Sequence, residues 1–363
     1  MRLLALTKYG PLAASTRQRF VQYEQSLADA NIEVIYSSLL DDSHVQRLAD
    51  ARRASPLLVA AAYARRVMAL LGARKYDALW IHYELFPYLP ATFERAAFLH
   101  GKPVIFDYDD AVFHTYDSSP FSIARWVLGG KLAPLIAGAT VVCCGNEYLR
   151  SHASRYNSNS VILPTVVDTD RYRPVIARRN HPLTIGWIGS PSTWRFVRPY
   201  LPLLAELCRD RDVRFVGVGA GRAAEADRFD GLTLEKWSEA GEIASVQAMD
   251  IGIMPLPDAP WARGKCGYKL IQYMACGLSV VASPVGVNSD IVVEGTTGFL
   301  ATSIAQWRSA LNRLIDDAEL RRRMGEAGRA RAEEAYSLQV HAPRLVDIML
   351  GALESREAAQ QIP

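Results

Sequence analysis

Residues 264–286 read Gly-Lys-Cys-Gly-Tyr-Lys-Leu-Ile-Gln-Tyr-Met-Ala-Cys-Gly-Leu-Ser-Val-Val-Ala-Ser-Pro-Val-Gly, a glycine-rich turn followed by a short helical pattern that ends at Gly277 and an apolar strand over 278–282. A helix that begins after such a turn presents free backbone N–H groups and the positive end of its dipole, and both suit a phosphate. Lys265 and Lys269 add positive charge to the turn. The stretch predicts an anion site in an α/β domain, although an ordinary helix–turn–strand unit has the same pattern.

Short aliphatic runs alternate with helical patterns along the whole chain. The expected strands lie at 3–6, 33–36, 78–83, 103–106, 140–143, 160–163, 183–187, 213–217, 232–236, 251–254, 278–282 and 298–301. Such alternation is typical of parallel βαβ units. It predicts an α/β protein with two Rossmann-like doubly wound domains, over residues 1–172 and 173–336, and a final helix 337–353 that joins the first domain. The stretch 169–182, rich in arginine and proline, marks the boundary.

Composition limits the classes of function. The 363 residues are 50% apolar and 22% charged, with a formal net charge of +3. This charge, without a basic run interleaved with aromatic residues, indicates no nucleic-acid partner. The five cysteines and seven histidines lack metal-ligand spacing, which predicts reduced thiols in the cytoplasm and no bound metal. We expect no membrane span and no signal peptide.

Two strand ends in the first half carry polar residues. The first strand runs into a loop with Gly10 and then into a helix that opens with Ser15, Thr16 and Arg17. This loop is suited to a phosphate or a sugar hydroxyl, but Ser15 or Thr16 is equally suited to capping the helix. Gly10 and Arg17, with Glu84 after the strand 78–83, are the candidates for the acceptor side.

The strand 103–106 is followed by Asp107, Asp109 and Asp110. Carboxylates crowded at a strand tip repel one another, so we expect one of them to accept a proton, orient an acceptor hydroxyl or hold a metal. Helix capping by Asp109 or Asp110 is the alternative.

The strand 183–187 leads to a second loop suited to a phosphate. Gly189 frees the backbone, Thr193 is a candidate helix cap, and Arg195 is expected in the first turn of the following helix. A cation there opposes the helix dipole unless an anion is bound between them, which points to a diphosphate. Trp237, after the strand 232–236, is expected to flank a nucleobase or to pack in the core.

Taken in order, these segments resemble the retaining glycosyltransferases of family 4 (glycosyl transferases group 1), which have the GT-B fold. Four segments carry the resemblance: Leu163–Pro174, Ala248–Leu256, Tyr268–Ser283 and Gly295–Leu300. It implies an acceptor in the first domain, a nucleotide sugar of the UDP or GDP type in the second, and reaction in a central cleft. It also implies transfer of a hexosyl group to a saccharide or lipid-linked acceptor without a metal, in the synthesis of cell-surface polysaccharide or glycolipid.

The resemblance assigns roles residue by residue. Arg195 aligns with a phosphate-binding lysine, and Gln272 aligns with a glutamate that binds the ribose hydroxyls. Lys269 and the N–H groups around Gly267 would face the diphosphate. The implied catalytic set is Asp109, Asp110, Arg195 and Lys269. The implied donor-binding set is Gly189, Ser190, Thr193, Trp237, Lys265, Gly267, Tyr268 and Gln272.

The chain departs from the family pattern at three positions. The family's paired glutamates are replaced by Gly264 and Gln272, and its cleft histidine aligns with Asp109. A branch of the family with such replacements resembles this chain. Two other interpretations stay open, namely a nucleotide-sugar-binding module without catalysis and a sugar-nucleotide epimerase of the same fold.

Two segments suggest peripheral contact with an anionic membrane surface at the inner face of the plasma membrane. Residues 52–75 mix arginines with aliphatic side chains, and residues 121–135 include Trp126 and Lys131. Basic amphipathic helices bind anionic lipid surfaces. Helices of a domain core with one solvated face have the same pattern.

Overall fold

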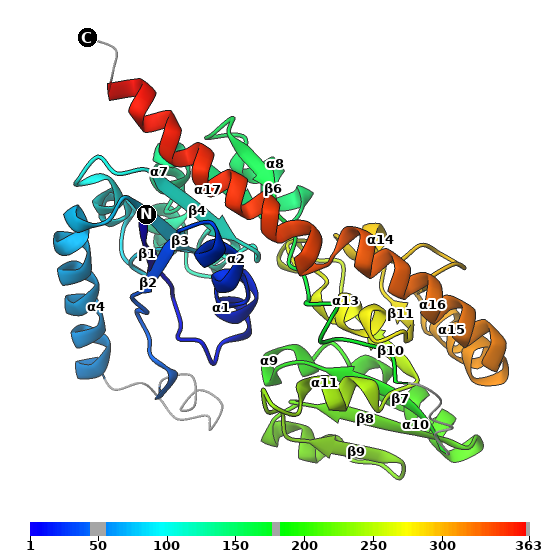
Figure 1. Ribbon diagram of the computed structural model, residues 1–363. Helices are drawn as coiled ribbons and strands as arrows, with labels where there is room; N and C mark the ends of the chain where they lie inside the picture. The colour runs from blue at the N-terminus through cyan, green and yellow to red at the C-terminus, as the bar shows by residue number, and fades with distance from the viewer. Residues whose placement is uncertain (44–55, 176–181, 361–363) are drawn as a thin grey trace. The chain divides into compact units, whose positions relative to one another are not determined.

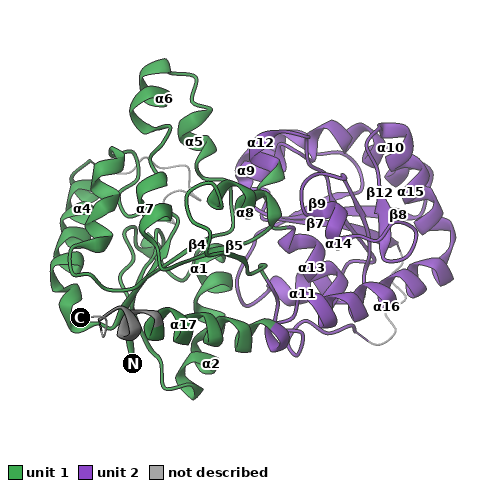
Figure 2. Ribbon diagram, turned by 90° about the horizontal axis from the view of Figure 1, so that it is seen from above, with its two compact units in different colours: residues 1–165, 263–266, 341–363 green, residues 166–262, 267–340 purple. Residues whose placement is uncertain are grey.

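The computed structural model describes residues 1–43, 56–175 and 182–360, with side chains up to residue 354. The chain forms two compact units, drawn in green and purple in Figure 2. Unit 1 comprises Met1–Thr165, Arg263–Cys266 and His341–Pro363, and unit 2 comprises Val166–Ala262 and Gly267–Val340.

Unit 1 contains a six-stranded parallel sheet of order β2-β1-β3-β4-β5-β6. Its strands are β1 (Arg2–Leu6), β2 (Glu33–Tyr36), β3 (Ala78–His82), β4 (Val104–Tyr108), β5 (Val141–Cys144) and β6 (Ser160–Ile162). Its helices are α1 (Ala14–Arg19), η1 (Val21–Tyr23), α2 (Glu24–Asp29), α4 (Pro56–Leu71), η2 (Gly72–Lys75), η3 (Ala91–Phe98), α5 (His114–Asp117), α6 (Ser122–Leu128), α7 (Ala133–Gly138) and α8 (Glu147–Ala153). In Figure 1, α4 lies along the flank of this sheet.

Unit 2 contains a second six-stranded parallel sheet, of order β12-β11-β10-β7-β8-β9. Its strands are β7 (Leu183–Ile188), β8 (Val213–Val218), β9 (Leu232–Glu235), β10 (Ile251–Met254), β11 (Ser279–Ala282) and β12 (Gly298–Leu300). Its helices are α9 (Pro191–Trp194), η4 (Arg198–Tyr200), α10 (Leu201–Asp210), η5 (Arg222–Asp227), α11 (Glu242–Gln247), α12 (Pro260–Arg263), α13 (Tyr268–Ala275), α14 (Asn288–Ile291), α15 (Ile304–Asp316) and α16 (Ala318–Ala335). The last helix, α17 (Leu338–Gln360), contributes residues to both units.

The prediction of two doubly wound α/β domains is confirmed. Each of the twelve strands lies within two residues of its expected position. The central strands β1, β3, β4, β5, β7, β8, β10 and β11 are almost wholly buried. Continuous aliphatic runs are expected where parallel strands are covered on both faces, so the sequence signal was strong.

The predicted boundaries differ in detail from the observed ones. The chain enters unit 2 at Val166, seven residues before the expected position, because Val167 bridges to Ser337 and the Tyr172 hydroxyl bonds to Glu242. Residues 176–181 of the expected linker lie outside the described residues. The helical pattern 17–30 is divided into α1, η1 and α2 at Phe20, which is fully buried and has non-helical torsion angles.

Candidate functional site

The edge of unit 2 that best fits a ligand site lies at the carboxyl ends of β7 and β10. The strand order reverses at this point, since β8 and β9 follow on one side of β7 and β10 to β12 on the other. Ligands of open α/β sheets bind at such a switch point. One hydrogen bond attaches the helix α13 to this edge. The Ile188 N–H at the end of β7 donates to the hydroxyl of buried Tyr273 on α13, 3.0 Å away.

Gly189, directly after β7, allows Lys269 to lie over this edge. A Cβ at Gly189 would overlap the Trp187 ring and come within 2.8 Å of Lys269 Cε. The Lys269 ammonium lies 5.8 Å from the centre of the Trp187 ring. Gly219, at the end of β8, has a φ of +77° and would place a Cβ against the Gly189 carbonyl, 3.1 Å from Trp237 Cβ. The structure therefore brings together the predicted residues Gly189, Lys269 and Trp237.

The start of α13 has the form predicted for an anion site. Gly267 precedes the helix with a φ of +64°, and no side chain caps the first turn within the described residues. A side chain at Gly267 would be strained and would overlap Ile291. Tyr268 and Lys269 are the first two residues of the helix, and both are half-buried. The backbone N–H groups of the first turn point along the helix axis at this end, and with the lysine they give the start of α13 a positive potential.

Gln272 belongs to a buried polar network. It is only 2% exposed, and its amide donates to Glu242 Oε1 at 2.7 Å and to the Tyr172 hydroxyl at 3.0 Å. The Tyr172 hydroxyl also donates to Glu242 Oε1, and the Trp237 indole N–H donates to Glu242 Oε2 at 2.7 Å. Tyr268 joins through its hydroxyl, 3.4 Å from that of Tyr172. Glu242, which the sequence analysis did not select, is thus the acceptor at the centre of this network.

The expectation for Arg195 needs a correction. The helix α9 has only four residues, so Arg195 is its C-terminal cap rather than part of its first turn. A cation is favourable at that end of a helix, so Arg195 does not oppose the dipole of α9 as predicted. Arg195 is exposed, with its guanidinium 4.8 Å from the centre of the Phe196 ring. The helix is capped by Ser190, whose N–H donates to Thr193 Oγ1.

In unit 1, the three crowded carboxylates have separate partners. Asp107 lies within β4, not beyond it, and is fully buried in a two-pronged ion pair with Arg19, at 2.8 and 2.9 Å. Burial alone would lower the pKa of Arg19, but the Asp107 charge raises it well above its ordinary value. Neither Asp109 nor Asp110 caps a helix, since α5 begins only at His114.

Asp109 stays ionised at neutral pH. Burial alone would raise the pKa of Asp109, but the nearby His82 ring, the Arg19 charge and the Tyr83 hydroxyl hold it at about 2. The Tyr83 hydroxyl donates to Asp109 Oδ1 at 2.5 Å, and the His82 ring lies 3.7 Å from the same atom. Tyr83 has a φ of +65°. Such backbone strain in a bulky residue is typical of functional sites.

Asp110 is paired with Lys265. The Lys265 ammonium lies 2.6 Å from Asp110 Oδ2, so this lysine belongs with the carboxylates of unit 1. Gly264 beside it is held by the Asn146 amide, which donates to the Gly264 carbonyl at 3.1 Å. A Cβ at Gly264 would overlap that of Ala111 and lie 2.9 Å from the Ala111 nitrogen. A glutamate at position 264 would therefore require the backbone here to shift.

The candidates for the acceptor side make packing contacts, hydrogen bonds or ion pairs within unit 1. Gly10 is buried, and a Cβ there would overlap the Asp42 carboxylate. Arg17 donates to the Leu12 carbonyl at 2.7 Å, and the N-terminal cap of α1 is Ala13 rather than Ser15 or Thr16. Glu84 is 1% exposed and pairs with Lys8 at 3.0 Å, while the Tyr116 hydroxyl donates to it at 2.6 Å.

Sequence reasoning missed Arg19, His82, Tyr83 and Glu242. His82 and Tyr83 close the strand 78–83, so the rule that selected Asp109 at a strand tip would have found them. No pattern marks Arg19 or Glu242, because their partners are distant in the sequence. Among the described residues, no group of three or more His, Cys, Asp or Glu side chains is arranged to hold a metal ion.

Comparison with solved structures identifies the fold. The chain superposes on the sucrose-phosphate synthase of Thermosynechococcus elongatus with a TM-score of 0.75, covering 98% of this chain and 100% of that one at 14% identity. It superposes on the Anabaena protein HepE, solved in complex with UDP-glucose, with a TM-score of 0.71, covering 97% and 100% at 15% identity. The fold is that of the GT-B glycosyltransferases.

Sequence comparison agrees with the fold. Residues 183–317 match the family model "Glycosyl transferases group 1". The chain is 28% identical over 273 residues to a D-inositol 3-phosphate glycosyltransferase of Corynebacterium aurimucosum, covering 67% of this chain and 63% of that protein. It is 26% identical over 251 residues to a GDP-mannose-dependent α-(1-6)-phosphatidylinositol monomannoside mannosyltransferase of Mycolicibacterium smegmatis, covering 61% and 64%. The matched stretches thus span less than two thirds of these curated relatives.

Proposed function

We propose that the protein is a retaining glycosyltransferase that transfers a hexosyl group from a UDP- or GDP-sugar to a saccharide or lipid-linked acceptor without a metal. One observation carries the proposal: Gly189, Gly219, Trp237 and the start of α13 meet at the switch point of unit 2, within the segment that matches glycosyl transferases group 1. The product class would be cell-surface polysaccharide or glycolipid, made in the cytoplasm.

The reaction breaks the bond between the anomeric carbon of the donor and its phosphate oxygen. The electron pair leaves with the nucleoside diphosphate, and the acceptor oxygen bonds to the same carbon on the same face. Its proton passes to the departing phosphate oxygen. Lys269 and the positive end of the α13 dipole would stabilise the charge that develops on the phosphate, by several kcal/mol in a preorganised site. Arg195 is the second cation proposed for this role.

Asp109 and Asp110 are proposed to orient the acceptor hydroxyl. A carboxylate whose pKa is about 2 is a weak base at neutral pH, so Asp109 suits accepting a hydrogen bond rather than removing a proton. Its orientation is fixed by Tyr83 and by Thr165, whose hydroxyl donates to Asp109 Oδ2 at 3.3 Å.

The full-length protein should release nucleoside diphosphate from at least one of UDP-glucose, UDP-galactose, GDP-mannose and TDP-glucose, by slow hydrolysis or by transfer to an added saccharide, in the presence of EDTA. Release that survives EDTA supports a metal-independent transferase. Tight binding of a donor without release in any acceptor mixture would favour the binding module. Conversion of a UDP-sugar to its epimer would favour the epimerase.

We also propose that unit 1 contacts an anionic lipid surface. Ile123 and Trp126 in the helix α6 are 76% and 87% exposed, and Phe121, the N-terminal cap of this helix, is 74% exposed. The helix α6 projects from unit 1 in Figure 2. The helical segment Pro56–Lys75 is long and apolar enough to cross a membrane, a property that it shares with core helices of soluble proteins, and 22% of its most apolar stretch is buried. Arg52 and Arg53 of the predicted basic segment lie outside the described residues.

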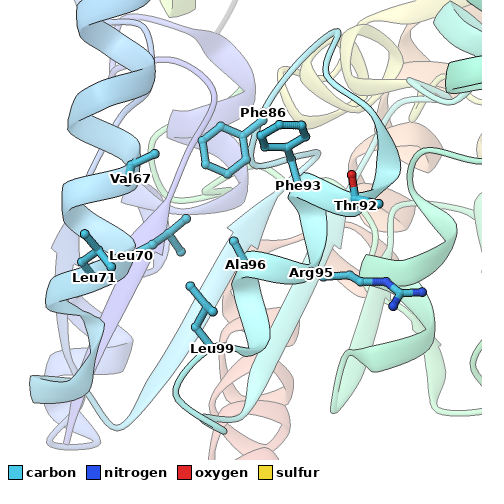
Figure 3. A pocket seen from close by; sticks show the side chains of 9 residues that line it. All are labelled: Val67, Leu70, Leu71, Phe86, Thr92, Phe93, Arg95, Ala96 and Leu99. Atoms are coloured by element: carbon cyan, nitrogen blue, oxygen red, sulfur yellow. The ribbon is translucent and has the colours of Figure 1, made fainter.

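An apolar hollow at α4 is a second candidate for this contact. A cavity of about 320 Å³ lies between α4 and η3 and is lined by Val67, Leu70, Leu71, Phe86, Thr92, Phe93, Arg95, Ala96 and Leu99 (Figure 3). Arg95 is the charged residue of this lining and is exposed. Exposed Arg65, Arg74 and Lys75 supply further positive charge on α4 and η2. Apolar side chains with basic neighbours match an anionic lipid surface.

Sedimentation with lipid vesicles tests this surface. We expect the protein to pellet with vesicles that contain phosphatidylglycerol, to stay in solution with phosphatidylcholine alone, and to be released by high salt because the attraction is screened. Trp126→Glu and Met68→Glu should each reduce the bound fraction several-fold. Ile304→Glu, which changes a 44% exposed residue of unit 2, is the control. Equal pelleting of all variants would contradict the proposal.

A further inference from the structure

The polar network around Glu242 lies next to the proposed diphosphate site. Gln272 follows Lys269 by three residues on α13, so the two share a face of the helix about 4.5 Å apart along its axis. Trp237, which bonds to Glu242, has its Cβ 3.1 Å from the position that a Cβ on Gly219 would take. In a nucleotide whose diphosphate lies beside Lys269, the ribose is one ester bond away from the diphosphate. That ribose would be within reach of this network.

We propose that Glu242 binds the ribose hydroxyls of the donor nucleotide, and that Gln272 acts by holding the Glu242 carboxylate in place. This inference rests on the proposed function, because it needs a nucleoside diphosphate at the switch point of unit 2. It differs from the role that the resemblance gives to Gln272. The carboxylate is supplied by α11 instead of α13.

The chemistry of the two side chains supports this division of roles. A carboxylate accepts at both oxygens and suits the paired hydroxyl donors of a ribose, whereas an amide has one acceptor oxygen. The Gln272 amide nitrogen already donates to Glu242 and Tyr172, and the residue is 2% exposed. Glu242 is 8% exposed, and its Oε2 accepts from the half-buried Trp237 while its Oε1 accepts from Gln272 and Tyr172. Each carboxylate oxygen has more than one lone-pair site, so a ribose hydroxyl would bind beside these donors. The indole face of Trp237 would then flank the base.

Calorimetric titration of the full-length protein with UDP, 2′-deoxy-UDP, GDP, 2′-deoxy-GDP and pyrophosphate tests the proposal. For the wild type, we expect the preferred ribonucleotide to bind at least about tenfold more tightly than its deoxy form, since a hydrogen bond to a charged group is lost. Glu242→Gln should bring this ratio close to one and leave the affinity for pyrophosphate unchanged. A variant that keeps the full ratio would overturn the proposal.

Exchanging the residues at positions 242 and 272 separates an effect on ribose binding from an effect on the stability of the fold. Gln272→Glu alone places two carboxylates beside one another and should weaken binding of both nucleotide forms, because they repel. The double variant Glu242→Gln, Gln272→Glu restores one carboxylate and one amide and should fold as the wild type does. Because its carboxylate lies at the more buried position, its ribo-to-deoxy ratio should stay close to one. A wild-type ratio in the double variant would assign the ribose to position 272.

The outcomes distinguish a failure of the role of Glu242 from a failure of the proposed function. If the wild type binds ribonucleotides and deoxyribonucleotides equally, the role of Glu242 is wrong and the proposed function stands. If the wild type binds pyrophosphate but no nucleotide, or none of these ligands, the proposed function fails and the role of Glu242 fails with it. Tm values of every variant, measured without ligand, show whether a loss of binding reflects a loss of folding.

Discussion

Asp107→Asn is expected to lower the free energy of unfolding of unit 1 by about 3–5 kcal/mol, because it leaves the buried Arg19 guanidinium without its counter-charge. Both side chains are 0% exposed, and Arg19 also donates to the Leu163 carbonyl at 2.7 Å. The carboxylate therefore compensates a charge that water does not reach. Urea unfolding followed by the fluorescence of buried Trp80, which packs on Phe20 next to Arg19, measures the effect.

Glu147→Gln provides the matched control. It makes the same acid-to-amide change in the same unit. The Glu147 side chain is 52% exposed, however, and that of its partner Arg150 is 41% exposed. Exposed pairs contribute about 0–1 kcal/mol, so the control should unfold close to the wild-type urea concentration. If Asp107→Asn unfolds no earlier than Glu147→Gln, then the buried pair is not a main determinant of the stability of unit 1.

Lys269→Ala is expected to reduce donor turnover by about 10²–10³-fold, the usual cost of removing one preorganised group that stabilises developing charge. Nucleoside diphosphate affinity should fall as well, because the same ammonium attracts the ground-state diphosphate. Arg195→Ala should weaken donor binding in the same assay. The measurements are kcat for release of the nucleoside diphosphate and Kd from calorimetric titration.

Arg209→Ala is the control for the loss of a cation from unit 2, since Arg209 lies on α10 and is 70% exposed. It should bind and turn over the donor as the wild type does. If Lys269→Ala and Arg195→Ala both retain normal donor affinity, the phosphate site has been placed wrongly. A loss of affinity in all three variants would indicate a general effect of charge instead of a defined site.

The sequence predicted the scaffold well because strands and helix starts are local features. Aliphatic runs, glycine turns and the residues that follow strand ends are read from neighbouring positions, and they located Gly189, Gly267, Lys269 and Asp109 at the expected edges. The length of α9 was not predictable in this way. Four helical residues carry too weak a pattern, and the role of Arg195 in the first turn depended on that length.

The side-chain partners were beyond prediction because they join distant parts of the chain. Lys265 pairs with Asp110 across 155 positions, and Arg19 pairs with Asp107 across 88. Gln272 meets Glu242 across 30 positions, from a helix that no motif marked. A glutamine in place of an expected glutamate is visible in a sequence, but the carboxylate that accompanies it is visible only in the fold.

The packing around Gly264 limits the substitutions that position 264 can accept. A single substitution to glutamate at position 264 would meet the Ala111 nitrogen as well as its methyl group, so shortening residue 111 to glycine would not make room. The backbone of the segment 263–266 would have to shift first. A glutamate at position 264 is therefore expected only together with a shift of this backbone segment, and nucleotide binding is more easily altered through Glu242 and Gln272 than by restoring the missing acid.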